Sequence, residues 1–492
     1  MAAMTSQPFI ADLVLTGGVV VSSKARFEAD VAIKDGVIVL VGAPEAMPAA
    51  AETVDVSGKF ILPGAIDVHV HFREPGYTHK EDWRTGSAAA AMGGTTTVFE
   101  MPNTHPPTRS LAELRRKQEA AAKSHVDYGI YGLLAEDNIG ELQGLIDGGV
   151  NAFKCFMGNT FGNLPSPSTG AMLEGFEIIA PSGLRVSLHA ETASIMAWRQ
   201  KRLMEAGRND PLAHVAARPA IVAAEAVARA AELAGWTGAR VHILHISSAL
   251  ELRPLAEAKA RGVDITGETC PCYLLLDTRD YARLGSIIRV NPPVREHADS
   301  LAIWEALASG VVDMIATDHA PHTPEEKTKD VIWQADCGFP GVETQMPLML
   351  DQVSRGRLTL EHYVRISAEN PARAFGLWPA KGRIEAGAQA DIAVVDMERS
   401  ETIAAARLHS RAKITPFEGV RVTGVPVHTL VRGRFVQRDR ALVEETSGWG
   451  RQVTDIQRMP APRPLNLDQT LAAVLQGPRA EPAQILAAGE RP

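Results

Sequence analysis

The chain has 492 residues, of which 45% are hydrophobic and 22% charged, as expected for a globular protein with one large and one smaller domain. Its formal net charge of −8 offers no basic excess for phosphates, which argues against a nucleic-acid partner. We see no apolar run long enough for a bilayer and no secretory signal, so we expect a cytoplasmic protein without membrane contact.

Residues 1–63 consist of short predicted strands separated by turns. The stretch "DLVLTGGVVV" is interrupted by its glycines, and "DVAIKDGVIVLVG" carries a Lys-Asp-Gly hairpin signal at residues 34–36. We therefore expect this segment to contribute strands to a small β domain.

Residues 64–378 differ, because short apolar strands alternate there with Ala-rich helical segments. For example, "GGTTTVFEM" precedes "SLAELRRKQEAAAKS", and "RVHILHI" precedes "SALELRPLAEAKARG". This alternation is typical of a parallel barrel, for which ~250 residues is usual. An open doubly wound sheet is the alternative, but no GxGxxG follows the first strand. We predict an α/β fold built on a TIM-like (β/α)8 barrel.

Residues 379–445 return to short strands with Gly-rich turns, so we expect both chain ends to form one small β-sandwich domain together. Residues 446–492 read as a Pro-rich, poorly ordered tail with one short amphipathic helix. The apolar face of that helix carries Leu467, Leu471, Val474 and Leu475. We expect it to dock on the body of the protein or on a neighbouring subunit.

Polar side chains recur at the C-terminal ends of the predicted barrel strands, where barrel enzymes carry their chemistry. The motif "DVHVH" places His69 and His71 on one side of the first strand, because side chains two apart share a face. Four later strands end in groups that can ligate or titrate: Lys154, His189, His242 with His245, and Asp318 with His319 and His322. Burying so many polar groups without partners is costly. A metal centre is the simplest common partner, and these ligand types suit zinc and similar divalent ions.

Lys154 is the exception, because an ammonium cannot ligate a metal. Burial would lower its pKa, and the free amine could add carbon dioxide to give a carbamate, a carboxylate on a long stem. A lysine paired with Asp318 or a glutamate is the alternative, and spacing alone does not separate the two. The four cysteines, including the close pair Cys270 and Cys272, are expected to be free thiols.

With these residues assembled, residues 10 to 445 resemble the cyclic amidohydrolases of the amidohydrolase superfamily: dihydroorotases, allantoinases, hydantoinases and dihydropyrimidinases. The motifs that carry the resemblance are "DVHVHFREPG", "EMPNT", "FKCFMG", "LHAE", "LHISS" and "ATDHAPHT". The resemblance implies two divalent metal ions, expected to be Zn²⁺. It assigns the ligands as His69, His71 and Asp318 for one ion, His189 and His245 for the other, and carboxylated Lys154 as the bridge. His242 and His319 match no ligand position.

Beside these ligands, Arg73, Asn103 and His322 match the three groups with which dihydroorotases hold the carboxylate of their substrate. A guanidinium fork, an amide and an imidazole suit a planar carboxylate. Asn291 and Gly338 match a contact to the pyrimidine ring and a backbone contact. The resemblance therefore implies a dihydroorotase, which reversibly hydrolyses the cyclic amide of dihydroorotate to N-carbamoyl-aspartate in pyrimidine biosynthesis. Asp318 would shuttle the proton.

An allantoinase, a hydantoinase or another cyclic amide hydrolase is the alternative, because "GFPGVETQMPLML" and "PFEGVRVTGVPV" are as similar to those enzymes. Arg73 would then have another use, such as a salt bridge to Glu74 or Asp82. A non-catalytic member would have lost ligands, and all of them are present in this sequence. We expect a homodimer or homotetramer that acts on a small cyclic ureide or amide.

Overall fold

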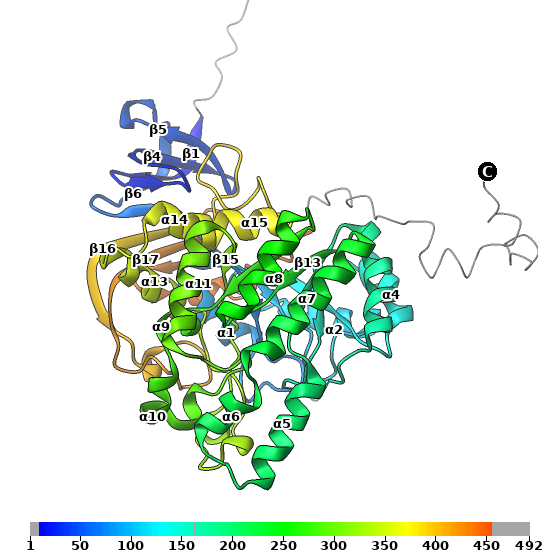
Figure 1. The fold of residues 1–492 in the computed structure, drawn as a ribbon. Coiled ribbons are helices and arrows are strands. Elements are labelled where there is room, and N and C mark those ends of the chain that lie inside the picture. Colours follow the sequence, from blue (N-terminus) through cyan, green and yellow to red (C-terminus); the bar gives the residue numbers. More distant parts are fainter. Residues whose placement is uncertain (1–8, 162–163, 455–492) are drawn as a thin grey trace, which may run out of the picture.

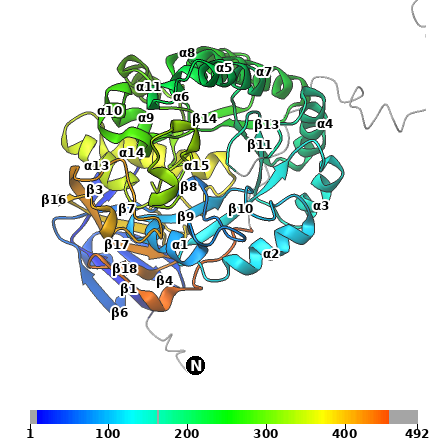
Figure 2. The same cartoon turned by 90° about the horizontal axis from the view of Figure 1, so that it is seen from below.

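The computed structural model of the protein describes residues 9–161 and 164–454. Its centre is a barrel of eight parallel strands inside a layer of helices (Figure 1, Figure 2). The strands neighbour one another in chain order: β8 (Ala65–Val70), β9 (Thr95–Glu100), β10 (Asp127–Leu134), β11 (Ala152–Phe156), β12 (Arg185–His189), β13 (Arg240–Ile243), β14 (Ile265–Thr269) and β15 (Met314–Ile315). A bridge between Val70 and His319 joins the first strand to the residues after the last. The predicted TIM-like barrel is confirmed.

The helices that surround the barrel follow the strands along the chain. They are α1 (Trp83–Met92), α2 (Leu111–Ala121), α3 (Leu142–Asp147), α4 (Thr169–Ile179), α5 (Ala193–Glu205), α6 (Pro211–Ala217), α7 (Ala220–Thr237), α8 (Ala249–Ala260), α9 (Pro271–Leu275), α10 (Tyr281–Leu284), α11 (His297–Ser309), α12 (Pro324–Lys327), α13 (Gln345–Ser354), α14 (Leu360–Val364) and α15 (Asn370–Ala374). Local sequence sets the ends of these helices. Asp82 caps α1 by accepting the N–H of Thr85 at 2.9 Å, and α7 ends at Gly238 in the left-handed conformation.

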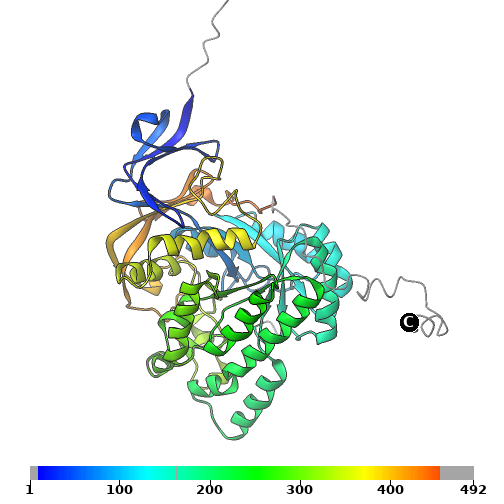
Figure 3. The same cartoon turned by 45° about the horizontal axis from the view of Figure 1, so that its top comes forward.

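The small β domain consists of two sheets, seen beside the barrel in Figure 1 and Figure 3. The four-stranded sheet has the order β5-β4-β1-β6, with β1 (Ile10–Thr16), β4 (Asp30–Lys34), β5 (Val37–Gly42) and β6 (Ala49–Asp55). The seven-stranded sheet has the order β19-β18-β17-β16-β7-β2-β3, with β2 (Val19–Val21), β3 (Arg26–Glu28), β7 (Phe60–Pro63), β16 (Ile392–Thr402), β17 (Arg421–Val431), β18 (Arg434–Arg438) and β19 (Ala441–Leu442). Both chain ends therefore supply strands to the second sheet, as predicted.

The predicted hairpin at residues 34–36 joins β4 to β5. Asp35 and Gly36 both have positive φ, of 51° and 78°, which is the geometry of a tight two-residue hairpin turn. Gly64 separates β7 of the β domain from β8 of the barrel. A Cβ at this position would lie 2.2 Å from a side-chain atom of Thr96 on β9, so the close approach of residue 64 to that strand requires glycine.

Residues 446–453, at the start of the predicted tail, pack against the N-terminal end of β10. The carbonyl of Arg451 accepts the N–H of Tyr128 at 2.9 Å, and the N–H of Val453 donates to the carbonyl of Tyr128 at 2.8 Å. The helix predicted within residues 466–477 lies outside the described residues. All four cysteines are free. None of the described helices combines the length and the apolar character that a membrane span requires.

Candidate active site

The histidines predicted from the strand ends converge at the C-terminal end of the barrel. The ring centroids of His69 and His71 lie 5.3 Å apart, those of His69 and His245 5.4 Å, and those of His245 and His189 4.7 Å. Each of the four side chains is at least nine-tenths buried. Three different strands therefore bring four imidazoles into one connected cluster.

Asp318 completes one side of this cluster. Its Oδ1 lies 3.2 Å from Nε2 of His69 and 3.0 Å from Nε2 of His71. Burial raises the pKa of Asp318 to about 6, and burial also holds the pKa of both histidines well below their usual range. Asp318 has a positive φ of 47°, a strained conformation that is characteristic of functional positions.

His189 and His245 form the other side of the cluster. Nδ1 of His189 lies 2.9 Å from Nε2 of His245, while Nε2 of His189 lies 3.0 Å from the buried carboxylate of Glu191. Arg218 pairs with the same carboxylate. The Glu191 contact fixes the proton of His189 on Nε2, which leaves the lone pair of Nδ1 directed at His245.

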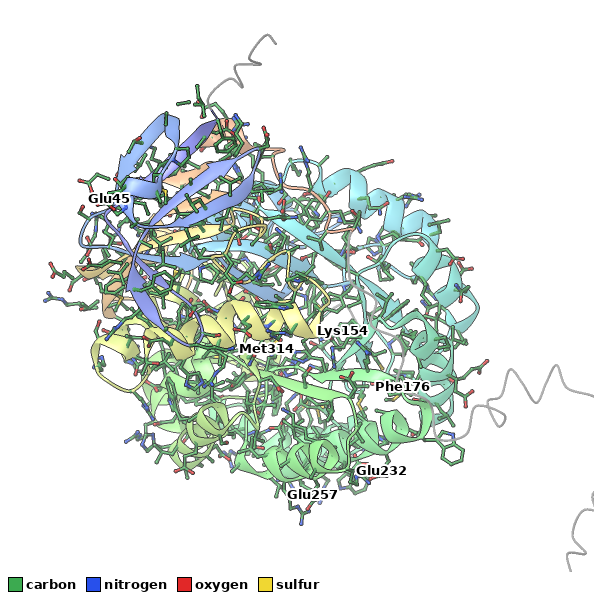
Figure 4. The ribbon with its side chains drawn as sticks, turned by 90° about the horizontal axis from the view of Figure 1, so that it is seen from above. Glu45, Lys154, Phe176, Glu232, Glu257 and Met314 are labelled. Atoms are coloured by element: carbon green, nitrogen blue, oxygen red, sulfur yellow. The ribbon has the colours of Figure 1, made fainter. Side chains whose placement is uncertain are left out.

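Lys154, labelled in Figure 4, lies in β11, and its side chain is buried. Its Nζ lies 4.7 Å from the centroid of the Phe156 ring, and it has no ion pair or hydrogen bond within the described parts of the chain. Burial lowers the pKa of this amine to about 8. No ion pair joins Lys154 to Asp318 or to a glutamate among the described residues, although the nearby charges of Asp318 and Glu268 act against the effect of burial on the pKa of the amine.

Hydrogen bonds from outside the cluster orient two of the imidazoles. Glu268, on β14, lies with Oε1 2.6 Å from Nδ1 of His69 and with Oε2 3.0 Å from Nε2 of His242. Nδ1 of His71 lies 2.7 Å from Oδ1 of Asn103. These contacts place the protons on Nδ1 of His69 and His71, so that both Nε2 lone pairs face Asp318. His242 thus contacts the carboxylate that also contacts His69.

The donor set fits divalent metal ions. His69, His71 and Asp318 present ligand atoms that all lie within 4.8 Å of one another. Metal ligation requires neutral imidazoles, and burial lowers the pKa of each one. Nδ1 of His245 is buried without a hydrogen-bond partner among the described residues, while its Nε2 lies within hydrogen-bonding distance, 2.9 Å, of Nδ1 of His189. Neutral imidazoles and a carboxylate gathered in this way are the ligand types that zinc and similar divalent ions prefer.

Arg73 lies directly beyond His71, with only 1% of its surface exposed and a positive φ of 62°. Its Nε donates to the carbonyl of Pro321 at 3.2 Å, and its Nη2 lies 3.1 Å from Nε2 of His322. Its Nη1 is buried without a hydrogen-bond partner in the described chain. The Phe161 ring covers the guanidinium, with 4.5 Å between Cζ and the ring centroid. Arg73 and His322 therefore lie side by side at the edge of the histidine cluster.

A sequence model of the amidohydrolase family matches residues 60–436, from the last strand before the barrel into the C-terminal strands. The chain belongs to the amidohydrolase family. It is 36% identical to the L-hydantoinase of Paenarthrobacter aurescens over 451 residues, which cover 90% of this chain and 98% of that protein. It is 40% identical to the dihydroorotase of Methanothermobacter thermautotrophicus over 398 residues, which cover 80% and 88% of the two chains.

The fold agrees with these relatives. The structure superposes on the L-hydantoinase (dihydropyrimidinase) of Arthrobacter aurescens with a TM-score of 0.88 and 35% identity, covering 90% of this chain and 100% of that one. This amidohydrolase is therefore a cyclic amide hydrolase of the hydantoinase, allantoinase and dihydroorotase group, and amidohydrolases of this family depend on metal ions.

The two remaining predicted contact residues of the amidohydrolase, Asn291 and Gly338, are both buried. The side-chain amide of Asn291 finds hydrogen-bond partners for both of its polar atoms when the nitrogen faces Nε2 of His214 at 3.2 Å and the oxygen accepts from Nη2 of Arg218 at 3.3 Å. Gly338 has a φ of 120°, and a Cβ there would lie 2.5 Å from Cβ of Ala320. Only glycine can bring the backbone this close to the residues that follow Asp318.

Sequence reasoning missed several charged residues that support the site of this amidohydrolase. Glu268 lies near the C-terminal end of β14, in "DITGETC", so its position close to a strand end was a usable signal. Glu191 was part of the motif "LHAE" but received no role. Lys80 and Glu81 follow the first strand in "GYTHKED", where nothing in the local pattern indicates that both are buried.

Proposed function

We propose that this amidohydrolase is a dihydroorotase, which opens the ring amide of dihydroorotate to N-carbamoyl-aspartate and closes it in the reverse direction. The supporting observation is the buried guanidinium of Arg73, which has no carboxylate partner among the described residues. Both carboxylates considered from the sequence pair elsewhere: Glu74 with Lys123 at 2.8 Å, and Asp82 with Arg411. An uncompensated buried charge costs about 3–5 kcal/mol. The carboxylate of dihydroorotate would supply the missing partner.

The neighbours of Arg73 suit the same carboxylate. Oδ1 of Asn103 is occupied by His71, whereas its Nδ2 makes only a long contact of 3.4 Å to the carbonyl of Phe161. Nδ2 is therefore available to donate to a substrate. His322 adds an imidazole next to the guanidinium. Groups that hold a substrate in a reactive orientation can lower a barrier by up to ~7–11 kcal/mol.

Asp318 is the proposed proton carrier for hydrolysis. The four imidazoles, Asp318 and carboxylated Lys154 would hold two divalent ions, which would supply activation of water and polarisation of the ring carbonyl as Lewis acids. Asp318 accepts the proton released by the attacking water and delivers it to the ring nitrogen as the C–N bond breaks. The reverse cyclisation begins with protonated Asp318. The raised pKa of Asp318, about 6, allows both states near neutral pH.

Hydantoin hydrolysis is the second candidate. It is favoured by the similarity to L-hydantoinases. The sequence alignment covers 98% of one such relative, and the superposition covers 100% of the solved L-hydantoinase chain. A hydantoin ring need not carry a carboxylate, so Arg73 would then serve another purpose. The two candidates therefore differ in what they require of this one side chain.

Substitution of Arg73 tests the proposal. Arg73→Met should lower kcat/KM for dihydroorotate by ~10²-fold or more, because two charge-assisted hydrogen bonds are lost. Arg73→Lys should recover little, since an ammonium cannot form the planar two-point contact. Turnover of carboxylate-free dihydrouracil should change far less, and the metal content should stay the same.

Arg84→Met is a matched control, because Arg84 forms an exposed ion pair with Glu444 outside the site. It should leave both substrates unaffected. Equal losses on dihydroorotate and dihydrouracil in Arg73→Met would show that Arg73 maintains the structure of the site, and the hydantoinase reading would then be preferred.

A further inference from the structure

Lys80 lies in the loop between β8 and α1, and only 4% of its surface is exposed. Its Nζ lies 2.9 Å from Nδ1 of His322, 2.8 Å from Oδ2 of Asp336 and 3.0 Å from Oε1 of Glu326. The last three residues have the spacing of a metal-binding group. The ammonium of Lys80 already supplies the cation among them, so a metal ion is not needed to explain the cluster.

His322 has one donor and one acceptor next to each of its ring nitrogens. At Nδ1 these are Nζ of Lys80 and Oδ2 of Asp336, both at 2.9 Å. At Nε2 they are Nη2 of Arg73 and the carbonyl of Cys337, both at 3.1 Å. Burial holds the pKa of His322 well below its usual range, so the ring carries one proton. Two arrangements are therefore self-consistent.

In one arrangement Nδ1–H donates to Asp336, and Nε2 accepts from Arg73. In that arrangement Nη2 of Arg73 donates to the imidazole, and the lone pair of Nε2 points toward the guanidinium. In the other, Nδ1 accepts from Lys80 and Nε2 carries the proton. Nη2 of Arg73 then no longer donates to the ring, while Nε2–H faces the carbonyl of Cys337. A substrate carboxylate can accept from the guanidinium and share the Nε2 proton with that carbonyl.

We propose that Lys80 is a positioning residue that selects the Nε2–H form of His322 and thereby creates the preference for a substrate with a carboxylate. The inference rests on the proposed function, because it assigns the pair of Arg73 and His322 to carboxylate recognition. Lys80 also lies over Phe161, with 4.3 Å between Nζ and the ring centroid, and so contacts the same aromatic ring as Arg73.

The direct test is the tautomer of His322, measured by ¹⁵N solid-state NMR on metal-loaded, histidine-labelled enzyme. The signal is assigned by its loss in His322→Asn. Wild type with N-carbamoyl-aspartate bound should show Nε2–H. Lys80→Met should show Nδ1–H, because only the acceptor Asp336 remains at Nδ1. Asp336→Asn removes that charged acceptor and should retain Nε2–H, so the two variants are expected to differ although each removes a charge from the same cluster.

Kinetics give the second readout. Lys80→Met should reduce kcat/KM for dihydroorotate by about tenfold or more, mainly through KM, and affect dihydrouracil much less. Lys123→Met removes a lysine from the partly exposed pair with Glu74 and should change neither substrate. Retention of Nε2–H in Lys80→Met, or equal losses on both substrates, would overturn the inference. A wild-type enzyme inactive on dihydroorotate would overturn the proposed function instead, and the tautomer would still decide the role of Lys80.

Discussion

Burial prepares the amine of Lys154 for carboxylation. The lowered pKa of about 8 means that about a tenth of these amines are neutral at pH 7, compared with well under a thousandth for an exposed lysine. A carbamate formed on this stem would serve only as a carboxylate. Its function could therefore be supplied from solution.

We predict that Lys154→Ala abolishes turnover, because it removes the one amine among the six proposed ligands, and with it the proposed carboxylated bridge. A short-chain carboxylic acid at high concentration should restore part of the activity. Turnover and metal content, measured with and without the acid, provide the check. A variant that retains two metal ions per chain and wild-type turnover would exclude the bridging role.

The pKa of Lys154 also predicts the direction in which the rate of carboxylation changes with pH. The neutral amine reacts with carbon dioxide, and its fraction grows as pH rises through about 8. At constant dissolved carbon dioxide, metal-free enzyme should therefore regain activity with zinc faster at pH 9 than at pH 7. The rate of reactivation is the measurement. A rate that is independent of pH, or that falls toward pH 9, would contradict a reactive amine.

Some of this site could be predicted from single residues, and some could not. The pairing of His69 and His71 could be predicted from the sequence, because side chains two residues apart in a strand lie on the same face. The contact of Lys80 with His322 spans 242 positions, and only the closed barrel brings the two together. The role of Glu268 depends on its distance to His69, 199 positions away. Sequence patterns indicate local geometry, whereas these pairings arise from tertiary packing.

The strands of the β domain show the same limit at the level of elements. The sequence predicted that both chain ends build one domain, because their turn-rich strands are alike. It did not predict that β2, β3 and β7 join the C-terminal strands while β1, β4, β5 and β6 form a sheet of their own. Strand partners are chosen by long-range packing, and neighbouring strands in sequence are only frequent partners.

The segment of residues 446–453 forms an additional anchor between the chain end and the barrel. Besides its backbone contacts to β10, Val453 accepts Nδ2 of Asn151 at 2.6 Å, and Nε1 of Trp449 donates to the carbonyl of Val431 at 2.8 Å. The guanidinium of Arg432 lies over the Trp449 ring, with 4.9 Å between Cζ and the ring centroid. Residues 446–453 therefore belong structurally to the body of the protein.

We predict that truncation after Thr454 preserves turnover, because every residue proposed for the site lies before it. Truncation after Glu445 should lower the melting temperature by several degrees, since several hydrogen bonds worth ~0.5–1.5 kcal/mol each are lost. Thermal unfolding of the two truncated proteins is the measurement. Equal melting temperatures would show that the anchor contributes nothing, and inactivity of the longer protein would show that the tail completes the site or the oligomer.

At the scale of the whole molecule, the β domain is connected to the metal-binding strand. β16 pairs with β7, and β7 leads through Gly64 into β8, which carries His69. Lys381 lies 2.7 Å from Asp127 of the barrel and also pairs with Asp391, next to β16. Buried contacts of this kind hold the two parts in one arrangement and limit movement of the first ligands.

In the proposed function, this architecture serves a ring that carries a carboxylate. This is tested by kcat/KM of the zinc-loaded, full-length enzyme on dihydroorotate, allantoin, hydantoin and dihydrouracil under identical conditions. We expect the highest value for dihydroorotate, because this substrate alone among the four supplies the carboxylate that Arg73 lacks. A higher value for hydantoin or allantoin, with dihydroorotate turned over slowly or not at all, would contradict it.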